Sequence, residues 1–270
     1  MAAVSQRLVD FANHRRQQPA PGIEVIVTPR YQVTLQADFP IPGPNSVAWI
    51  RCRPDEADDV IREARAAIAP RHLPVMWTLD PETAPADFAD HLAAHDVLPD
   101  QRAPRVEVML VPIDARIESP TVAGLEIHDA LADPATFRQA DAVSAEAFGS
   151  RILGGDDPEL MESLERRRRN QIAAGDRHVL LATVDGEPAG TGALTLAPPF
   201  AGMINGGAVR PKFRGRGVYL ALVAARMEIA RRAGVDGLVV WGAPSSAPIL
   251  ARRGFQTVGW REFYPDTSTA

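Results

Sequence analysis

The second half of the chain carries the clearer pattern of apolar and polar positions. Residues 178–197 form two apolar runs joined by Asp185-Gly186, a pair typical of a tight turn between antiparallel strands. Another apolar run, at 203–209, precedes a stretch rich in glycine and arginine. After that stretch, from Val218 on, apolar side chains recur at helical spacing: Leu220, Val223, Ala224, Met227 and Ala230. This order predicts a hairpin, a further strand and then an amphipathic helix.

Weaker patterns surround these elements. Helices are predicted at 133–149 and 156–175, each introduced by Asp before Pro, which is a typical helix start. The remaining predicted elements are strands at 125–130 and 237–243, a short helix at 246–253 and a last strand from Gly254-Phe255. Hairpins come first and alternating strands and helices come later. The pattern therefore predicts a mixed α/β sheet with helices on both faces.

The first half is harder to interpret. Residues 1–45 are rich in proline and are predicted to be irregular, apart from a strand at 23–28. The elements predicted after them are strands at 46–52, 73–79 and 105–113, with helices at 54–69 and 84–98. Turn-forming residues at 114–124 indicate a linker. We therefore expect two domains, 1–118 and 119–270.

Composition narrows the class of protein. The chain has 270 residues, of which 46% are hydrophobic, and a net charge of -5, so it gives no reason to expect nucleic acid or an anionic membrane as partner. Its one cysteine, Cys52, excludes an intrachain disulfide. With no visible leader or membrane-length apolar run, a cytoplasmic protein without a metal is expected, and a homodimer is left open. The run Arg166–Arg169 is expected to be a solvated helix face.

Positive charge gathers where the helix after residue 210 should begin. The first N–H groups of a helix have no intrahelical partners, and the helix dipole adds partial positive charge there. Gly215 and Gly217 leave room beside those groups, and Lys212, Arg214 and Arg216 add full charges. The stretch therefore predicts a phosphate or pyrophosphate site. It fits neither the Walker loop nor the dinucleotide fingerprint.

Two stretches carry a family resemblance. "VRPKFRGRGVYLALV" resembles the acyl-CoA-binding motif of the GCN5-related N-acetyltransferase (GNAT) family, Gln/Arg-x-x-Gly-x-Gly/Ala, with Arg214 and Gly217 matching and Tyr219 in place of the last small residue. "LVVWGAPSSAPILARRGF" is similar to the next motif of the family. The resemblance covers roughly 120–265. The first half lacks the glycine loop and is either a degenerate GNAT-like half or an unrelated α/β cap.

The resemblance implies a GNAT fold and a reaction. Acetyl-CoA would be the co-substrate, and the amine of a small molecule or peptide would attack its thioester directly. Ala208 and Val209 would bind the pantetheine amides, and an N–H at or just before Ala208 would hold the thioester oxygen. Gly206 and Gly207 suit a bulge in that strand. The pyrophosphate would lie on Arg214, Gly215, Arg216, Gly217, Val218 and Tyr219.

Two catalytic side chains of the family are missing. Leu250 stands where many members carry a general-acid Tyr, and Met203 stands where some carry a Glu base. Ser246 or Tyr264 is a candidate substitute for the acid. The candidates for the base are Glu146, Asp156 and Asp157. The gaps leave open a CoA-binding sensor or partner module without turnover, and a nucleotide-binding protein unrelated to acetyl transfer remains a third reading.

Overall fold

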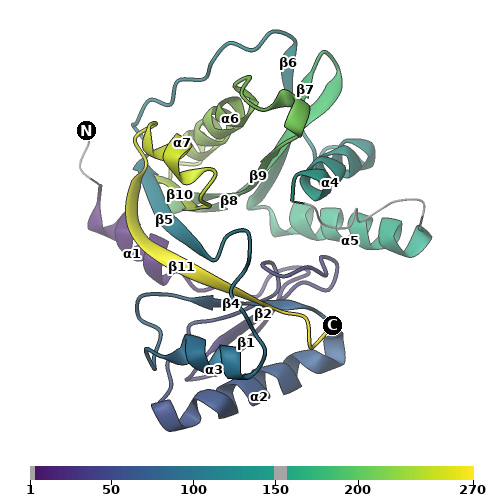
Figure 1. Ribbon diagram of the computed structural model, residues 1–270. Helices are drawn as coiled ribbons and strands as arrows, with labels where there is room; N and C mark the ends of the chain where they lie inside the picture. Colours follow the sequence, from purple (N-terminus) through teal and green to yellow (C-terminus); the bar gives the residue numbers. More distant parts are fainter. Residues whose placement is uncertain (1–3, 149–156) are drawn as a thin grey trace. The chain divides into compact units, whose positions relative to one another are not determined.

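The computed structural model describes residues 4–148 and 157–270, and its chain divides into two compact units (Figure 1). Unit 1 comprises Met1–Arg15, Met109–Val240 and Pro248–Val258, and unit 2 comprises Arg16–Val108, Trp241–Ala247 and Gly259–Ala270. Two strands, β5 (Arg105–Pro112) and β11 (Gln256–Asp266), run from one unit into the other. Each half of the sequence therefore contributes segments to both units. The domain boundary placed at 118/119 stays a prediction.

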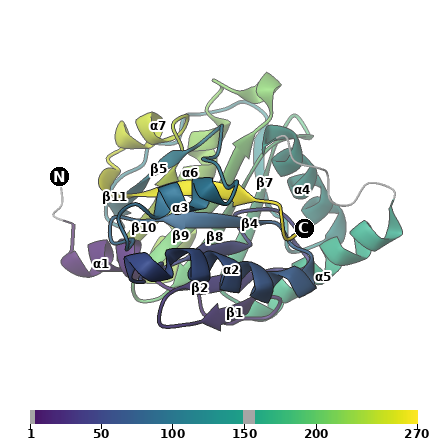
Figure 2. The same cartoon turned by 60° about the horizontal axis from the view of Figure 1, so that its bottom comes forward.

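Unit 2 is a mixed sheet with helices on one face. Its strands follow the order β1 (Glu24–Val27), β2 (Gln32–Leu35), β3 (Ser46–Ala48), β4 (Val75–Leu79) and β11. Only the pair β3–β4 is parallel. The connection between these two strands holds the short helix η1 (Pro54–Glu56), α2 (Ala57–Ile68) and η2 (Ala69–Arg71). Apolar side chains of α2 and of α3 (Phe88–Ala94) share one core with β2, β3 and β4, and the two helices lie side by side (Figure 2).

Unit 1 contains the predicted hairpin and the strand, helix and strand predicted after it. Its strands follow the order β5, β10 (Gly237–Gly242), β9 (Ala201–Val209), β8 (Glu187–Ala197), β7 (Arg177–Val184) and β6 (Leu125–Asp129). Its helices are α1 (Gln6–His14), α4 (Pro134–Phe148), α5 (Pro158–Ala174) and α6 (Val218–Arg232), with the short η3 (Pro211–Phe213) and α7 (Ala247–Ala251). The pair β9–β10 is parallel, whereas β6 to β9 are antiparallel. The mixed α/β fold with helices on both faces is confirmed.

Alternation along β7 explains the two helical layers of unit 1. Leu181 packs with Phe137 of α4 and Leu164 of α5, whereas Leu180 and its alternate neighbours pack with Leu222 of α6. Successive strand residues point to opposite faces of a sheet, so each face gets its own core. Helix starts also follow the prediction, because Asp133 and Asp157 accept hydrogen bonds from backbone N–H groups of the first turns of α4 and α5.

Three expectations from the sequence were wrong. The region 1–45 contains α1 and β2, which the proline-rich composition hid. The helix expected at 84–98 is limited to α3. The Arg166–Arg169 run is not uniformly solvated, because Arg167 is 8% exposed and pairs with the carboxylate of Asp141 on α4. No helix among the described residues has the length and apolar character needed to cross a membrane.

Candidate cofactor site

Helix α6 begins without a side-chain cap. Its N-cap residue is Gly217, with φ +93°, and the N–H of Ala221 makes the first turn's hydrogen bond to the Gly217 carbonyl. The N–H groups before Ala221 cannot find an intrahelical partner. Gly215 also has positive φ, +74°, and a side chain built on it would meet no atom within 4 Å. The structure therefore has the positively polarised helix start that the sequence predicted, with open space at Gly215. At Gly217 the expected room is missing, because Pro120 and Val122 lie against it.

Cations surround this start. Arg214, Gly215 and Arg216 are exposed. The Arg214 Nε donates to the carbonyl of Val209 at 3.1 Å, and the Arg216 guanidinium lies 5.4 Å from the centre of the Phe213 ring. Lys212 pairs instead with Glu187. The two arginines thus stand beside the helix start with their charge in solvent, where an anion can reach them.

Strand β9 contains the bulge that its glycines suggested. Thr191 on β8 faces Ala208, and Ala193 faces Asn205, so Gly206 and Gly207 together oppose the single residue Gly192. Gly206 has φ +57°, a conformation that non-glycine side chains rarely adopt. This irregularity lies in the strand that leads directly into the cationic loop.

Strands β9 and β10 separate near the bulge. Their register pairs Gly202 with Leu238 and Met203 with Val239, and from Ile204 on β9 pairs only with β8. The N–H of Arg210 donates to Ala189 of β8 at 2.9 Å. Backbone groups alternate in direction along a strand, so the N–H of Val209 points away from β8 and that of Ala208 points toward it. Beyond Met203, the backbone groups of β9 that face away from β8 are therefore not paired with β10 and can bind another partner.

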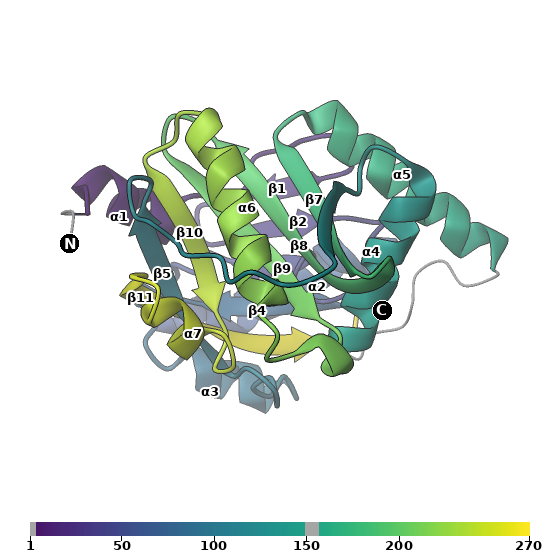
Figure 3. The ribbon, with the colours of Figure 1, turned by 90° about the horizontal axis from the view of Figure 1, so that it is seen from above.

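Glycines bring α6 close to this sheet (Figure 3). A side chain on Gly190 would lie 3.0 Å from Val218, and one on Gly202 would lie 3.1 Å from Ala230. A side chain on Gly207 would lie 3.0 Å from the Tyr219 ring. Tyr219, the departure from the family motif, therefore packs against the bulge, where a glycine accommodates it.

The candidates for acid and base belong to different units of the chain. The Glu146 carboxylate of α4 lies 2.9 Å from the Arg210 Nε, next to the cationic loop. In unit 2, the Ser246 hydroxyl donates to the Ala243 carbonyl at 3.3 Å. Tyr264, also in unit 2, is 7% exposed within the hydrophobic core, and burial raises the pKa of its phenol. Asp157 caps α5, and Asp156 lies outside the described residues. Among the described candidates in unit 1, Glu146 is the one that contacts a residue next to the predicted cofactor loop.

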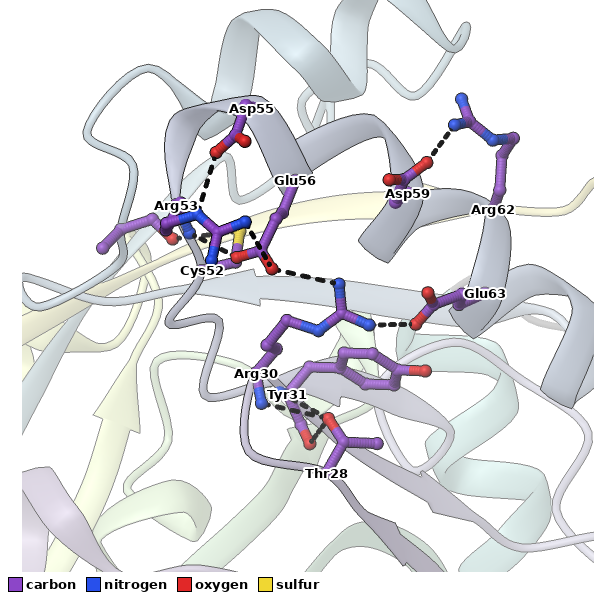
Figure 4. Close-up of polar contacts among 11 residues, drawn as sticks. Thr28, Arg30, Tyr31, Cys52, Arg53, Asp55, Glu56, Asp59, Arg62 and Glu63 are labelled. Atoms are coloured by element: carbon purple, nitrogen blue, oxygen red, sulfur yellow. Dashed lines mark hydrogen bonds and ion pairs between the residues drawn. The ribbon is translucent and has the colours of Figure 1, made fainter.

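In unit 2, acidic side chains of η1 and of the first two turns of α2 form ion pairs with arginines (Figure 4). The N–H of Arg53 donates to Glu56 at 2.9 Å, and Arg53 also pairs with Asp55 at 3.1 Å. Arg30 links Glu56 and Glu63, and Arg62 pairs with Asp59. This βαβ crossover has no glycine between β3 and α2, and acidic groups occupy its helix start. We therefore expect one cofactor site per chain.

Histidines and acids in the part of the chain that the structure describes form no group suited to hold a metal ion. His91 and His95 of α3 both contact the Asp58 carboxylate of α2, at 3.0 and 3.2 Å. Their helical spacing therefore serves a link between two helices.

Comparisons with known proteins agree with this geometry. Residues 146–255 match the family model described as the acetyltransferase (GNAT) family. None of the curated proteins matches the sequence. The fold resembles a GCN5-related N-acetyltransferase from Kribbella flavida, at 17% identity and a TM-score of 0.61, over 91% of this chain and 90% of that one.

Two further solved structures share the fold over nearly the whole chain. A conserved protein of unknown function from Staphylococcus epidermidis has 12% identity and a TM-score of 0.67, over 92% of this chain and 95% of that one. A tandem GNAT protein from the clavulanic acid biosynthesis pathway has 16% identity and a TM-score of 0.57, over 93% of this chain and 85% of that one. The family match lies in the second half and includes the glycine- and arginine-rich stretch before α6. Residues 146–255 are therefore similar in sequence to the acetyltransferase (GNAT) family, and nearly the whole chain shares the fold of solved GNAT structures.

Proposed function

We propose that this protein transfers the acetyl group of acetyl-CoA to the amine of a small molecule or peptide, with its cofactor site in unit 1. The observation that carries the proposal is the uncapped, glycine-flanked start of α6, with Arg214 and Arg216 exposed beside it. Backbone N–H groups and a helix dipole at such a start bind phosphate groups. The pyrophosphate of CoA would lie on residues 214–219.

The pantetheine arm would follow β9. Because the backbone groups of Val209 point away from β8, the Val209 N–H is available to an amide of pantetheine. We move the second contact from Ala208, whose backbone faces β8, to Gly207 in the bulge. The thioester would then lie near Gly206-Gly207, where a backbone N–H can stabilise the oxygen as negative charge develops on it.

The reaction needs no covalent enzyme intermediate. The neutral amine nitrogen forms a bond to the thioester carbon and then gives its extra proton to solvent. The tetrahedral intermediate collapses, and the carbon–sulfur bond breaks to release CoA as its thiolate, which takes up a proton from solvent. The attacking ammonium must first lose a proton. Glu146 is the carboxylate next to the loop, and we propose that it takes this proton through water once it is released from Arg210. A thiol with a pKa near ~8.5 leaves at a cost of about 2 kcal/mol near neutral pH, so Leu250 in place of an acid is tolerable.

One observation favours a second candidate, a CoA-binding module without turnover. Leu250 is fully buried, and Met203 takes the place of the base with its sulfur 3.1 Å from the Arg15 guanidinium. Neither the leucine nor the methionine side chain can donate or accept a proton. A panel of amines with acetyl-CoA distinguishes the two candidates, because only the enzyme releases thiol faster when an amine is present.

CoA and acetyl-CoA are expected to raise the melting temperature, whereas ATP and NAD are not. A ligand at a hundredfold excess over its dissociation constant stabilises the folded state by about 2.7 kcal/mol. For a chain of this length we expect a shift of roughly 5–10 °C, from about 2–4 °C per kcal/mol. Thermal unfolding followed by circular dichroism or dye fluorescence measures it. Equal shifts with ATP would instead support a general nucleotide-binding protein.

A further inference from the structure

A buried arginine lies between α6 and the bulge of β9. Arg226 is 1% exposed, two turns into the helix from Tyr219. Its Nε donates to the Leu222 carbonyl of its own helix at 2.9 Å. Its Nη1 reaches the sheet, at 3.2 Å from the Ala193 carbonyl and 3.4 Å from the Asn205 carbonyl. Ala193 and Asn205 are the pair that faces each other immediately before the bulge.

The charge of Arg226 has no carboxylate partner among the described residues. Burial lowers the pKa of this guanidinium to about 10, which still leaves it protonated near neutral pH. Its Nη2 has no hydrogen-bond partner in the described part of the chain. A buried cation that is neither paired nor fully hydrogen-bonded costs folding free energy. Packing alone therefore gives no reason for an arginine at this position.

The sheet is shaped around this side chain. A side chain on Gly192 would lie 2.9 Å from the Arg226 Cζ and Nη1, and one on Gly207 would lie 3.5 Å from the free Nη2. Gly192 and Gly207 are residues of the bulge itself. The same helix provides the cationic start at Gly217 and, nine residues later, the donor that holds the bulge.

We propose that Arg226 is a positioning residue that fixes the β9 bulge so that its backbone N–H groups meet the pantetheine and thioester of the cofactor. This rests on the proposed function, because it assigns those N–H groups to acetyl-CoA. Arg226 acts through the backbone of Asn205–Gly207 and does not touch the pyrophosphate. It should therefore affect the pantetheine end of the cofactor and leave the nucleotide end alone.

Arg226→Met tests this with two probes, CoA and adenosine 3′-phosphate 5′-diphosphate, which is CoA without pantetheine. Met is close to arginine in length and removes the buried charge, so the variant is expected to fold. Calorimetry should show CoA affinity at least tenfold weaker and affinity for the pantetheine-free nucleotide within twofold of the parent. Arg231→Met, on the exposed face of the same helix, should leave both affinities unchanged.

Gly192→Ala is the second variant, to be used if Arg226→Met does not fold. The added carbon would displace the guanidinium from both carbonyls, so the same selective loss of CoA affinity is expected. Undiminished CoA binding in a folded variant, or an equal loss for both probes, would overturn the positioning role while leaving the proposed function intact. A parent protein that binds neither probe would overturn both.

Discussion

Reversing the charge of Arg214 and Arg216 together, as Arg214→Glu/Arg216→Glu, is expected to weaken CoA binding by about a hundredfold, or about 2.7 kcal/mol. Two cations beside the α6 start become two anions facing a pyrophosphate, and charge-assisted hydrogen bonds are lost as well. Both side chains are exposed, so the free energy of unfolding should change by no more than about 0.5 kcal/mol each. Isothermal titration calorimetry and urea unfolding measure the two effects separately.

The matched control is Arg169→Glu, an exposed arginine on α5 away from the loop. Its CoA affinity should equal that of the parent. Arg167 is unsuitable as a control because its buried pair with Asp141 would be broken. A double variant that binds CoA as tightly as the parent would show that the cofactor does not use this loop.

Gly217→Glu is a less informative variant than its position suggests. Gly217 has φ +93°, and a side chain on it would lie 2.5 Å from Pro120 and 3.1 Å from Val122. A loss of CoA affinity would therefore be mixed with backbone strain and a clash. The arginine pair changes charge at the same site without either problem.

Asp266→Asn is expected to lower the free energy of unfolding of unit 2 by about 3–5 kcal/mol, because it removes one partner of a buried ion pair. The Asp266 side chain is 2% exposed and accepts from Arg65 at 2.8 Å, Trp77 at 3.1 Å and the Ser268 N–H at 3.0 Å. The NH2 group of an asparagine at this position would face one of these N–H donors, and neither group could accept a hydrogen bond from the other. Urea unfolding of parent and variant measures the difference, and Asp59→Asn, at an exposed ion pair, should cost less than about 1 kcal/mol.

The same carboxylate gives a pH dependence. Burial alone would raise the pKa of Asp266, but hydrogen bonds from Arg65, Ser268 and Trp77 outweigh it and hold the pKa below its usual value. A lowered folded-state pKa stabilises the fold above the unfolded value, near ~3.9, and this contribution is lost as pH falls through the folded value. The difference between parent and Asp266→Asn should therefore shrink below about pH 4. A difference that stays constant down to pH 2 would contradict this assignment.

The elements around residues 210–217 could be predicted because their signals are local. Asp185-Gly186 marks a hairpin by backbone conformation alone, and the glycines at 206 and 207 mark a bulge. The uncapped start of α6 follows from Gly217 and the apolar positions after it. Each of these features is determined by residues close together in the sequence, so one amino-acid sequence is enough to predict it.

Features that depend on distant neighbours were missed. The apolar stripe assigned to α6 includes Val223, Met227 and Ala230, which are buried, but omits Leu222 and Arg226. Arginine is usually exposed, so its burial had no local signal except its spacing of four from both Leu222 and Ala230. The sequence also did not reveal that β11 runs from unit 1 into unit 2, because β11 pairs with β4, which lies far away in the sequence. Pairing at that distance follows from tertiary packing and not from a local pattern.

The position of the cofactor is tested most directly by adding CoA to ¹⁵N-labelled protein and recording amide chemical shifts. We expect the largest changes at the N–H groups of Gly215, Gly217, Val218, Gly207 and Val209, with saturation at one CoA per chain. The amides around Arg53 and Glu56, at the start of α2, should not respond. Changes confined to the α2 start, or their absence from both Gly217 and Val209, would show that CoA does not bind along β9 and the α6 start.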